Sequence, residues 1–141
     1  MQKDQIIIHT DGGSRGNPGP SACAFVVEKD GQEIYKASKY LGIETNNYAE
    51  YNGVILALEW ISKEPQFSNS KLPIIFYSDS ELIVRQLIGL YKIKNETLKL
   101  LSEKAKKIIN ENNLEVTFEN IPREKNKIAD LLVNIELDGK R

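Results

Sequence analysis

The feature that most constrains this chain is a stretch near its start, where an apolar run meets a carboxylate and then a glycine-rich segment. Residues 6–10 read Ile-Ile-Ile-His-Thr, Asp11 follows, and Gly12 and Gly13 come next. A β-branched run of this kind predicts a buried strand, and two successive glycines permit a sharp turn with positive φ. We therefore expect Asp11 at the carboxyl end of a central strand, where open sheets place their ligands. The alternative is an ordinary Asp-Gly hairpin turn.

Length and composition predict a single domain over residues 1–141. The chain is 40% hydrophobic, which is enough to fill one core. No apolar stretch approaches the roughly 20 residues of a membrane span, and no export signal is recognisable. Cys23 is the only cysteine, so it cannot form an internal disulfide, and we expect it to be a small buried hydrophobe. We expect a cytoplasmic monomer with no membrane partner.

The overall charge does not by itself indicate a nucleic-acid-binding protein, because the chain has 19 basic and 20 acidic residues. Its distribution is less even. Lysines dominate the stretch from Arg85 to Lys107, whereas acidic residues dominate residues 41–64. The lysine-rich stretch is interpreted either as a solvated helix face or as a basic surface for phosphates.

Hydrophobic periodicity predicts three strands followed by alternating helices and strands. The expected strands cover residues 5–10, 21–29, 32–41, 73–77 and 114–120, and the expected helices cover residues 47–63, 80–90, 96–110 and 127–135. Strands joined by tight turns should be antiparallel, and strands joined through helices should be parallel with right-handed crossovers. The order βββαβααβα therefore predicts an α/β fold, a five-stranded mixed sheet flanked by helices.

Local rules give expectations for a few further positions. Gly53 weakens the first helix, which indicates a close approach to another backbone one turn from Glu50. His9 is interpreted as a strand residue rather than a catalytic one. The tail, residues 138–141, is expected to fray.

Four carboxylates are the candidate catalytic residues. Asp11 and Asp79 each follow an expected strand, so they leave the same sheet edge if those strands are parallel neighbours. Glu50 falls in the first turn of the first long helix and Asp130 inside the last one, both among apolar residues. Taken singly, Asp11 could be a turn former, Asp79 a helix cap and Glu50 a charge that favours a helix N-terminus. A mid-helix Asp at position 130 is harder to explain in that way.

Carboxylates that share a pocket repel one another unless a cation holds them. Hard oxygen ligands favour Mg²⁺ or Mn²⁺, and with one His and one Cys in the chain a zinc site is implausible. Two such ions about 4 Å apart can activate a water and stabilise a leaving oxygen. Phosphoryl transfer is the chemistry that this set of residues favours.

Four motifs, in this order, resemble type 1 ribonuclease H in a compact form without a basic protrusion. They are Thr-Asp-Gly-Gly-Ser-Arg-Gly-Asn-Pro-Gly-Pro at residues 10–20, Thr-Asn-Asn-Tyr-Ala-Glu at 45–50, Ser-Asp-Ser at 78–80 and Asn-Lys-Ile-Ala-Asp at 126–130. The resemblance covers the chain from Ile6 to about Asn134 and implies the ribonuclease H-like fold. It also implies an endonuclease that cuts the RNA strand of RNA–DNA hybrids, leaving 3′-hydroxyl and 5′-phosphate ends. Two Mg²⁺ ions, with Mn²⁺ as an alternative, would be held by Asp11, Glu50, Asp79 and Asp130.

The resemblance further implies substrate contacts. Backbone groups of Gly12, Gly13 and Ser14 would contact RNA 2′-hydroxyls, and Thr45 would bind a DNA phosphate. The side chains that would touch the minor groove are those of Asn17, Asn46 and Asn47. A wide, shallow minor groove displays 2′-hydroxyls, and glycine allows the backbone to approach them. The alternative role for the asparagines is helix capping.

The chain departs from the family pattern in the loop before the last helix, where many members carry a His. Here residues 121–126 contain none, and Arg123 is the candidate replacement. Because Arg stays charged, it would act on phosphate rather than shuttle a proton. The alternative is an ordinary surface charge.

Two other functions are consistent with the same fold. One is a catalytically weak module that binds nucleic acid, although a phosphate-binding groove gains nothing from four carboxylates. The other is a nuclease for a different substrate, such as duplex RNA or DNA junctions. The glycine and asparagine positions favour a substrate that contains RNA.

Overall fold

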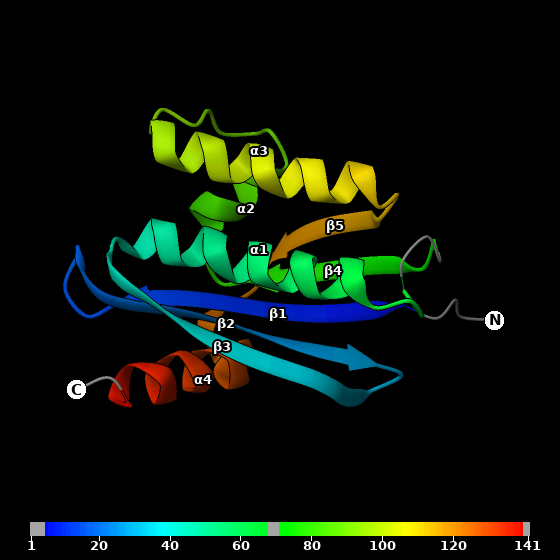
Figure 1. The fold of residues 1–141 in the computed structure, drawn as a ribbon, viewed down its shortest axis with the longest axis horizontal. Coiled ribbons are helices and arrows are strands. Elements are labelled where there is room, and N and C mark those ends of the chain that lie inside the picture. Colours follow the sequence, from blue (N-terminus) through cyan, green and yellow to red (C-terminus); the bar gives the residue numbers. More distant parts are fainter. Residues whose placement is uncertain (1–4, 68–70, 140–141) are drawn as a thin grey trace.

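The computed structural model of the chain describes residues 5–67 and 71–139. One five-stranded sheet, in the strand order β3-β2-β1-β4-β5, forms its centre (Figure 1). The strands are β1 (Ile6–Ser14), β2 (Gly19–Lys29), β3 (Gln32–Glu44), β4 (Pro73–Ser78) and β5 (Glu115–Asn120). The helices are α1 (Asn46–Lys63), α2 (Glu81–Leu87), α3 (Glu96–Glu111) and α4 (Lys127–Asp138), with a short 3₁₀ helix at Arg123–Lys125. The predicted element order and α/β class are confirmed.

The sheet is mixed, as expected from the connections. β1 pairs antiparallel with β2 and parallel with β4, β2 pairs antiparallel with β3, and β4 pairs parallel with β5. Helix α1 covers one face of the sheet and α3 packs outside it, while α4 covers the other face (Figure 1). The result is a layered molecule in which β1 lies in the middle of the sheet.

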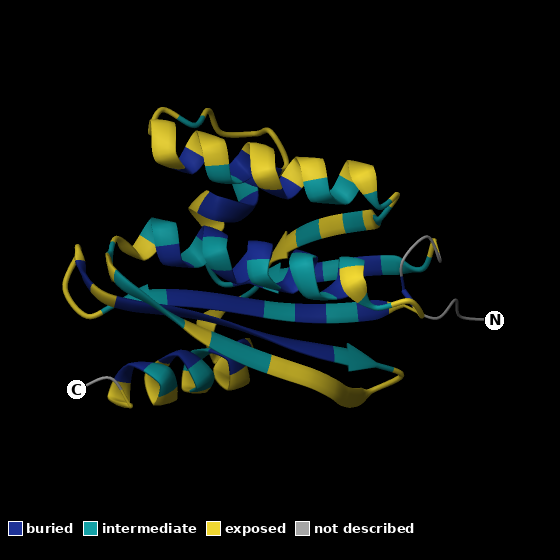
Figure 2. Cartoon of the chain, viewed as in Figure 1, coloured by how far each residue is buried: buried dark blue, intermediate teal, exposed yellow. Residues whose placement is uncertain are grey.

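The main core lies between the sheet and α1. Its largest fully buried side chains include Tyr51, Phe25, Phe67 and Phe76. Figure 2 shows that buried residues run along β1 and β2, whereas most of α3 is exposed. A second, smaller cluster joins α4 to β2 through Ala22, Ala24, Val133 and Leu137. Cys23 is buried, as expected.

The glycines after Asp11 do not form the turn that the sequence predicted. β1 continues to Ser14, and Gly12 and Gly13 remain paired with β2 opposite Cys23 and Ala22. Positive φ first occurs at Gly16, with a value of 97°. Asp11 therefore lies within β1 rather than at its end, and the hairpin-turn alternative is wrong as well.

Other boundaries also differ. Helix α2 ends at Leu87 instead of residue 90, and α4 reaches Asp138 instead of residue 135. Asp138 belongs to this helix and pairs with Arg15, so the expected fraying is wrong at that position. Residues 140–141, and residues 68–70 of the expected loop before β4, lie outside the described residues.

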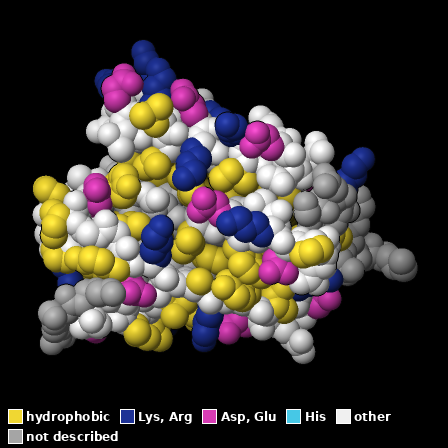
Figure 3. All heavy atoms as spheres, in the orientation of Figure 1, with side chains coloured by type: hydrophobic (Ala, Val, Ile, Leu, Met, Phe, Trp, Pro, Cys, Tyr) yellow, Lys and Arg dark blue, Asp and Glu magenta, His cyan; other side chains and the backbone are white. Residues whose placement is uncertain are grey.

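The lysine-rich helix α3 carries no continuous basic surface on the face seen in Figure 3, where positive and negative side chains alternate. One of its lysines, Lys104, lies 3.8 Å from Glu59 of α1. The face of α3 seen in this view therefore has the pattern of a solvated helix face. No helix among the described residues has both the length and the apolar character that a membrane crossing requires.

Candidate active site

Two parallel strands place the first two carboxylates side by side. The pairing between β1 and β4 ends at Thr10 and Ser78, and the next residues are Asp11 and Asp79. Both therefore lie where the pairing of these two strands ends, side by side as predicted, although Asp11 remains paired with β2. Asp79 is not the cap of α2, because the side chain of Ser80 accepts the hydrogen bond from the Ile83 N–H.

Two glycines allow helix α1 to pack closely enough on β1 to place Glu50 over Asp11. A Cβ added at Gly12 would lie 2.2 Å from the backbone carbon of Ala49, and one at Gly53 would lie 2.8 Å from the backbone oxygen of Asp11. Helix α1 thus crosses β1 at backbone contact, which confirms the predicted close approach at Gly53. Glu50 falls in the second turn of α1, since no acidic residue lies in the first. The expected position in the first turn, and with it a role at the helix N-terminus, is wrong.

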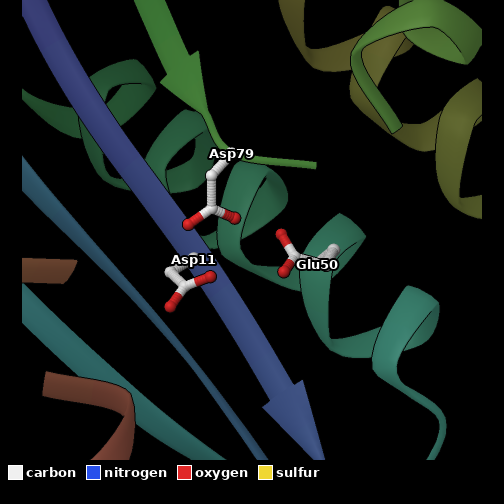
Figure 4. A group of neighbouring side chains, drawn as sticks. All are labelled: Asp11, Glu50 and Asp79. Atoms are coloured by element: carbon white, nitrogen blue, oxygen red, sulfur yellow. The ribbon is translucent and has the colours of Figure 1, made fainter. Parts of the chain in front are cut away.

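Asp11, Glu50 and Asp79 form one compact group. Each offers a carboxylate oxygen, and these three oxygens lie within 4.8 Å of one another (Figure 4). In Figure 4 the side chains point toward one another from β1, α1 and the end of β4. Within residues 5–67 and 71–139, no other group of three or more His, Cys, Asp or Glu side chains meets this criterion.

Burial and mutual repulsion perturb the protonation of this group. Burial, followed by the charge of Asp79, raises the pKa of Asp11 from 3.8 to about 7. Burial and the charges of both neighbours also raise the pKa of Glu50 well above its usual range. Glu50 Oε2 is buried and has no hydrogen-bond partner in the described part of the chain. At neutral pH the group therefore retains protons or needs a cation.

The fourth predicted residue, Asp130, lines the same cleft but does not belong to the compact group. It lies in the first turn of α4 rather than in mid-helix, and its carboxylate there is favoured by the helix dipole. Its charge contributes to the raised pKa of Asp11, which places it within electrostatic reach. The expected mid-helix position is therefore wrong, and a favourable charge near the helix N-terminus is an ordinary structural alternative for Asp130 as well.

Asn126 is a site residue that the sequence did not single out. It is 1% exposed, and its Nδ2 donates to the backbone oxygen of Thr10 at 2.9 Å and to Asp79 Oδ2 at 3.4 Å. It therefore fastens the start of α4 to β1 and orients Asp79. An Asn just before a helix usually indicates a cap, but this side chain makes no capping bond.

The carboxylates line a cleft of about 460 Å³. Most of the predicted substrate residues line it as well, namely Gly12, Gly13, Ser14, Asn46, Asn47 and Arg123. Thr45 and Asn17 are not part of the lining. Thr45 caps α1 by accepting from the Tyr48 N–H, and Asn17 lies one hydrogen bond away from the lining, at Asn46.

Backbone hydrogen bonds orient two of the predicted asparagine side chains. The Ser14 N–H donates to Asn46 Oδ1 at 2.7 Å, and the Asn46 N–H donates to Asn17 Oδ1 at 3.0 Å. A backbone N–H can bond only to the oxygen of a side-chain amide, so both amide orientations are determined. No partner of either Nδ2 is found in the described part of the chain, so each can donate to a ligand.

The donor set fits a hard divalent cation. Three clustered carboxylates supply the oxygen ligands that such ions prefer, and the unpartnered Glu50 Oε2 is an atom that a cation would satisfy. The single His of the chain lies in β1, where its ring packs 5.3 Å from that of Tyr77. Its role as a strand residue is confirmed.

Comparison with known proteins identifies relatives along almost the whole chain. The family described as "Reverse transcriptase-like" matches residues 9–135. The bifunctional protein Rv2228c of Mycobacterium tuberculosis is 35% identical over 96% of this chain, which spans only 36% of that protein. Ribonuclease HI of Halobacterium salinarum is 34% identical over 95% of this chain and 65% of its own length.

Solved ribonuclease H structures are also similar to this chain over almost its whole length. LC11-RNase H1, crystallised in complex with an RNA/DNA hybrid, superposes with a TM-score of 0.91 at 42% identity and covers 96% of this chain and 99% of its own. The N-terminal RNase H domain of Rv2228c superposes with a TM-score of 0.85 at 32% identity, covering 96% and 94%. Both likenesses extend over the elements that position the carboxylates.

Proposed function

Because the chain belongs to the type 1 ribonuclease H family, we propose that it is an endonuclease that hydrolyses the RNA strand of RNA–DNA hybrids. The products would carry 3′-hydroxyl and 5′-phosphate ends. The observation that carries the proposal is the compact group of Asp11, Glu50 and Asp79 in an open cleft. Such a group disfavours a purely structural or binding role, because it repels phosphate unless cations are present.

The proposed cofactor is a pair of Mg²⁺ ions, with Mn²⁺ as an alternative. The residues that would hold them are Asp11, Glu50, Asp79 and Asp130. The chemistry that two bound ions supply is activation of a water and stabilisation of the leaving oxygen. The chain itself supplies fixed ligands: Asn126 holds Asp79, and the contact between α1 and β1 holds Glu50 over Asp11.

Substrate recognition would use the rim of the cleft. The Nδ2 groups of Asn17 and Asn46 are donors, and every base pair offers acceptors in the minor groove, so these contacts would not depend on sequence. The extended backbone of Gly12, Gly13 and Ser14 would lie against RNA 2′-hydroxyls.

Further polar contacts are proposed at three positions. Thr45 and Arg123 would bind phosphates, and Asn47 would contact the minor groove. The proposed oligomeric state is a monomer.

Incubation of labelled substrates with Mg²⁺ or Mn²⁺ tests this function. We expect cleavage of the RNA strand of a hybrid, with 3′-hydroxyl and 5′-phosphate products, and no cleavage in chelator. Duplex RNA, duplex DNA and a DNA junction are the comparison substrates. Preferred cleavage of one of these, or binding of the hybrid without cleavage, would contradict the proposal.

A further inference from the structure

Arg15 is a charged residue of the cleft to which neither the family resemblance nor the catalytic cluster gives a role. It follows β1 directly, and its side chain lines the cleft that holds the carboxylates. Its Nη2 lies 2.8 Å from Asp138 Oδ1, and 3.3 and 3.4 Å from the side-chain and backbone oxygens of Asn134. No contact of its Nη1 or Nε is found among the described residues, so these nitrogens keep their donors.

The charges in the cleft make this arginine unusual. Four carboxylates line the cleft, and among the described residues its basic lining consists of Arg15 and Arg123. The whole chain has a net charge of −1, so it offers a polyanion no general attraction. A cation within the cleft is therefore well placed to offset its carboxylates toward a polyanion.

The two arginines lie near opposite ends of α4. Arg123 precedes its first turn, whereas Arg15 contacts Asn134 and Asp138 in its second half. A helix of this length extends about 18 Å, which is several times the spacing of neighbouring phosphates along a strand. A phosphate bound at Arg15 would therefore differ from the one proposed for Arg123.

We propose that Arg15 binds a phosphate of the RNA strand and that Asp138 occupies its guanidinium in the absence of substrate. The inference rests on the proposed function and adds a binding residue to it. The RNA strand is favoured because Arg15 directly follows Gly12–Ser14, the segment proposed to meet the 2′-hydroxyls. Guanidinium binds phosphate through two parallel hydrogen bonds, and each of its two donor pairs combines Nη2 with either Nη1 or Nε. Release of Nη2 by Asp138 would therefore complete such a pair with a nitrogen that is already free.

The contacts seen in the structure suit such an exchange. The side chains of Arg15 and Asp138 are 42% and 51% exposed, and an ion pair this accessible to water is weak. Asn134 in turn donates from Nδ2 to the backbone oxygen of Asp130, which directs its Oδ1 toward Arg15. Asn134 thus orients the guanidinium without neutralising it, and Asp138 is the partner that a phosphate replaces.

The first test measures hybrid affinity as a function of salt, with Asp79→Asn present in every protein to keep the hybrid intact. We expect Arg15→Ala to weaken binding about three- to tenfold and to lower the slope of log K against log salt by about 0.7–0.9. Arg15→Lys should retain the slope, because the charge remains. A slope unchanged in Arg15→Ala would overturn the proposal.

The matched variant Asp138→Asn distinguishes phosphate binding from a purely structural clamp. Both variants remove the exposed Arg15–Asp138 ion pair, and urea unfolding of each shows whether the fold is retained. If Arg15 binds phosphate, Arg15→Ala weakens hybrid binding whereas Asp138→Asn strengthens it or leaves it unchanged. If the ion pair only fastens the segment after β1 to α4, both variants weaken hybrid binding, and the proposal is wrong.

Single neutral methylphosphonate linkages, placed along each strand in turn, identify the phosphate. In the Asp79→Asn background, the difference in hybrid affinity between Arg15 and Arg15→Ala should vanish at one RNA position, and its loss at a DNA position would overturn the strand assignment. Failure of the proposed function is seen separately, as absence of hybrid cleavage by the wild-type chain. An active enzyme whose salt slope does not depend on Arg15 contradicts this inference alone.

Discussion

Asp79 has two opposing effects, because its charge destabilises the metal-free cluster while its oxygens are needed to bind metal. It raises the pKa of both Asp11 and Glu50 through its charge. Asp79→Asn should therefore reduce hybrid cleavage about 100-fold or more and stabilise the metal-free protein by about 1 kcal/mol. Single-turnover cleavage and urea unfolding in chelator measure the two effects. Glu119→Gln is the control, because Glu119 is an exposed carboxylate at the end of β5. Near wild-type cleavage by Asp79→Asn would refute the metal assignment.

Arg123 lines the cleft from the 3₁₀ helix that precedes α4, and its side chain is exposed. A side chain that binds a substrate phosphate at this position contributes to substrate binding more than to the stability of the fold. We expect Arg123→Ala to lower kcat/KM about three- to tenfold and to change unfolding by less than about 0.5 kcal/mol. Lys125→Ala is the matched control, because Lys125 belongs to the same 3₁₀ helix but lines a different pocket, beside His9. Equal kcat/KM values for the two variants would show that Arg123 is an ordinary surface charge.

At the level of elements, periodicity and turn residues predicted the order and type of every main helix and strand. They failed at Gly12 and Gly13 because the conformation of a glycine depends on its neighbours. These two glycines stay extended because β2 pairs with them and because α1 leaves no room for a side chain at Gly12. A sequence shows that glycine is present but not which partner approaches it.

Gly53 gives the contact between α1 and β1 a direct test. Alanine normally stabilises a helix relative to glycine by about 1 kcal/mol. Here its Cβ would lie 2.8 Å from the Asp11 backbone oxygen, so α1 must move away from β1. We expect Gly53→Ala to destabilise the protein by about 1–2 kcal/mol and to weaken Mg²⁺ binding, because Glu50 moves with the helix. Urea unfolding and Mg²⁺ titration calorimetry measure both effects.

Ser62→Ala, later in α1, is the control for that substitution, since the Ser62 hydroxyl donates within the helix, to the backbone oxygen of Glu59. It should leave Mg²⁺ binding unchanged. Stabilisation by Gly53→Ala, with metal affinity retained, would show that the close approach is not needed to place Glu50.

For the whole molecule, the cluster of carboxylates could be predicted only in part. The parallel pairing of β1 and β4 was enough to bring Asp11 and Asp79 together. The position of Asp130 and the buried contact of Asn126 with Thr10 depend on how α4 packs against the sheet. Asn126 and Thr10 are more than a hundred positions apart in the sequence. Local patterns carry no information about such distances.

The raised pKa values predict how the stability of the whole molecule depends on pH. Asp11 titrates near 3.8 in an unfolded chain and near 7 in the folded protein, so the folded state holds the extra proton between these values. Its contribution to stability is complete at low pH and is lost as pH rises to about 7, by about 2–4 kcal/mol. Glu50 shifts in the same direction and adds to the loss.

Urea unfolding of wild type and Asp11→Asn in chelator isolates this effect from that of the other acids. The advantage of the variant should grow as pH rises from about 5 to about 8, because the asparagine has no charge to bury. Mg²⁺ should reverse the trend for wild type alone, since it binds the ionised carboxylates and releases their protons. A stability difference independent of pH, or equal stabilisation of both proteins by Mg²⁺, would contradict a proton-holding metal site at Asp11.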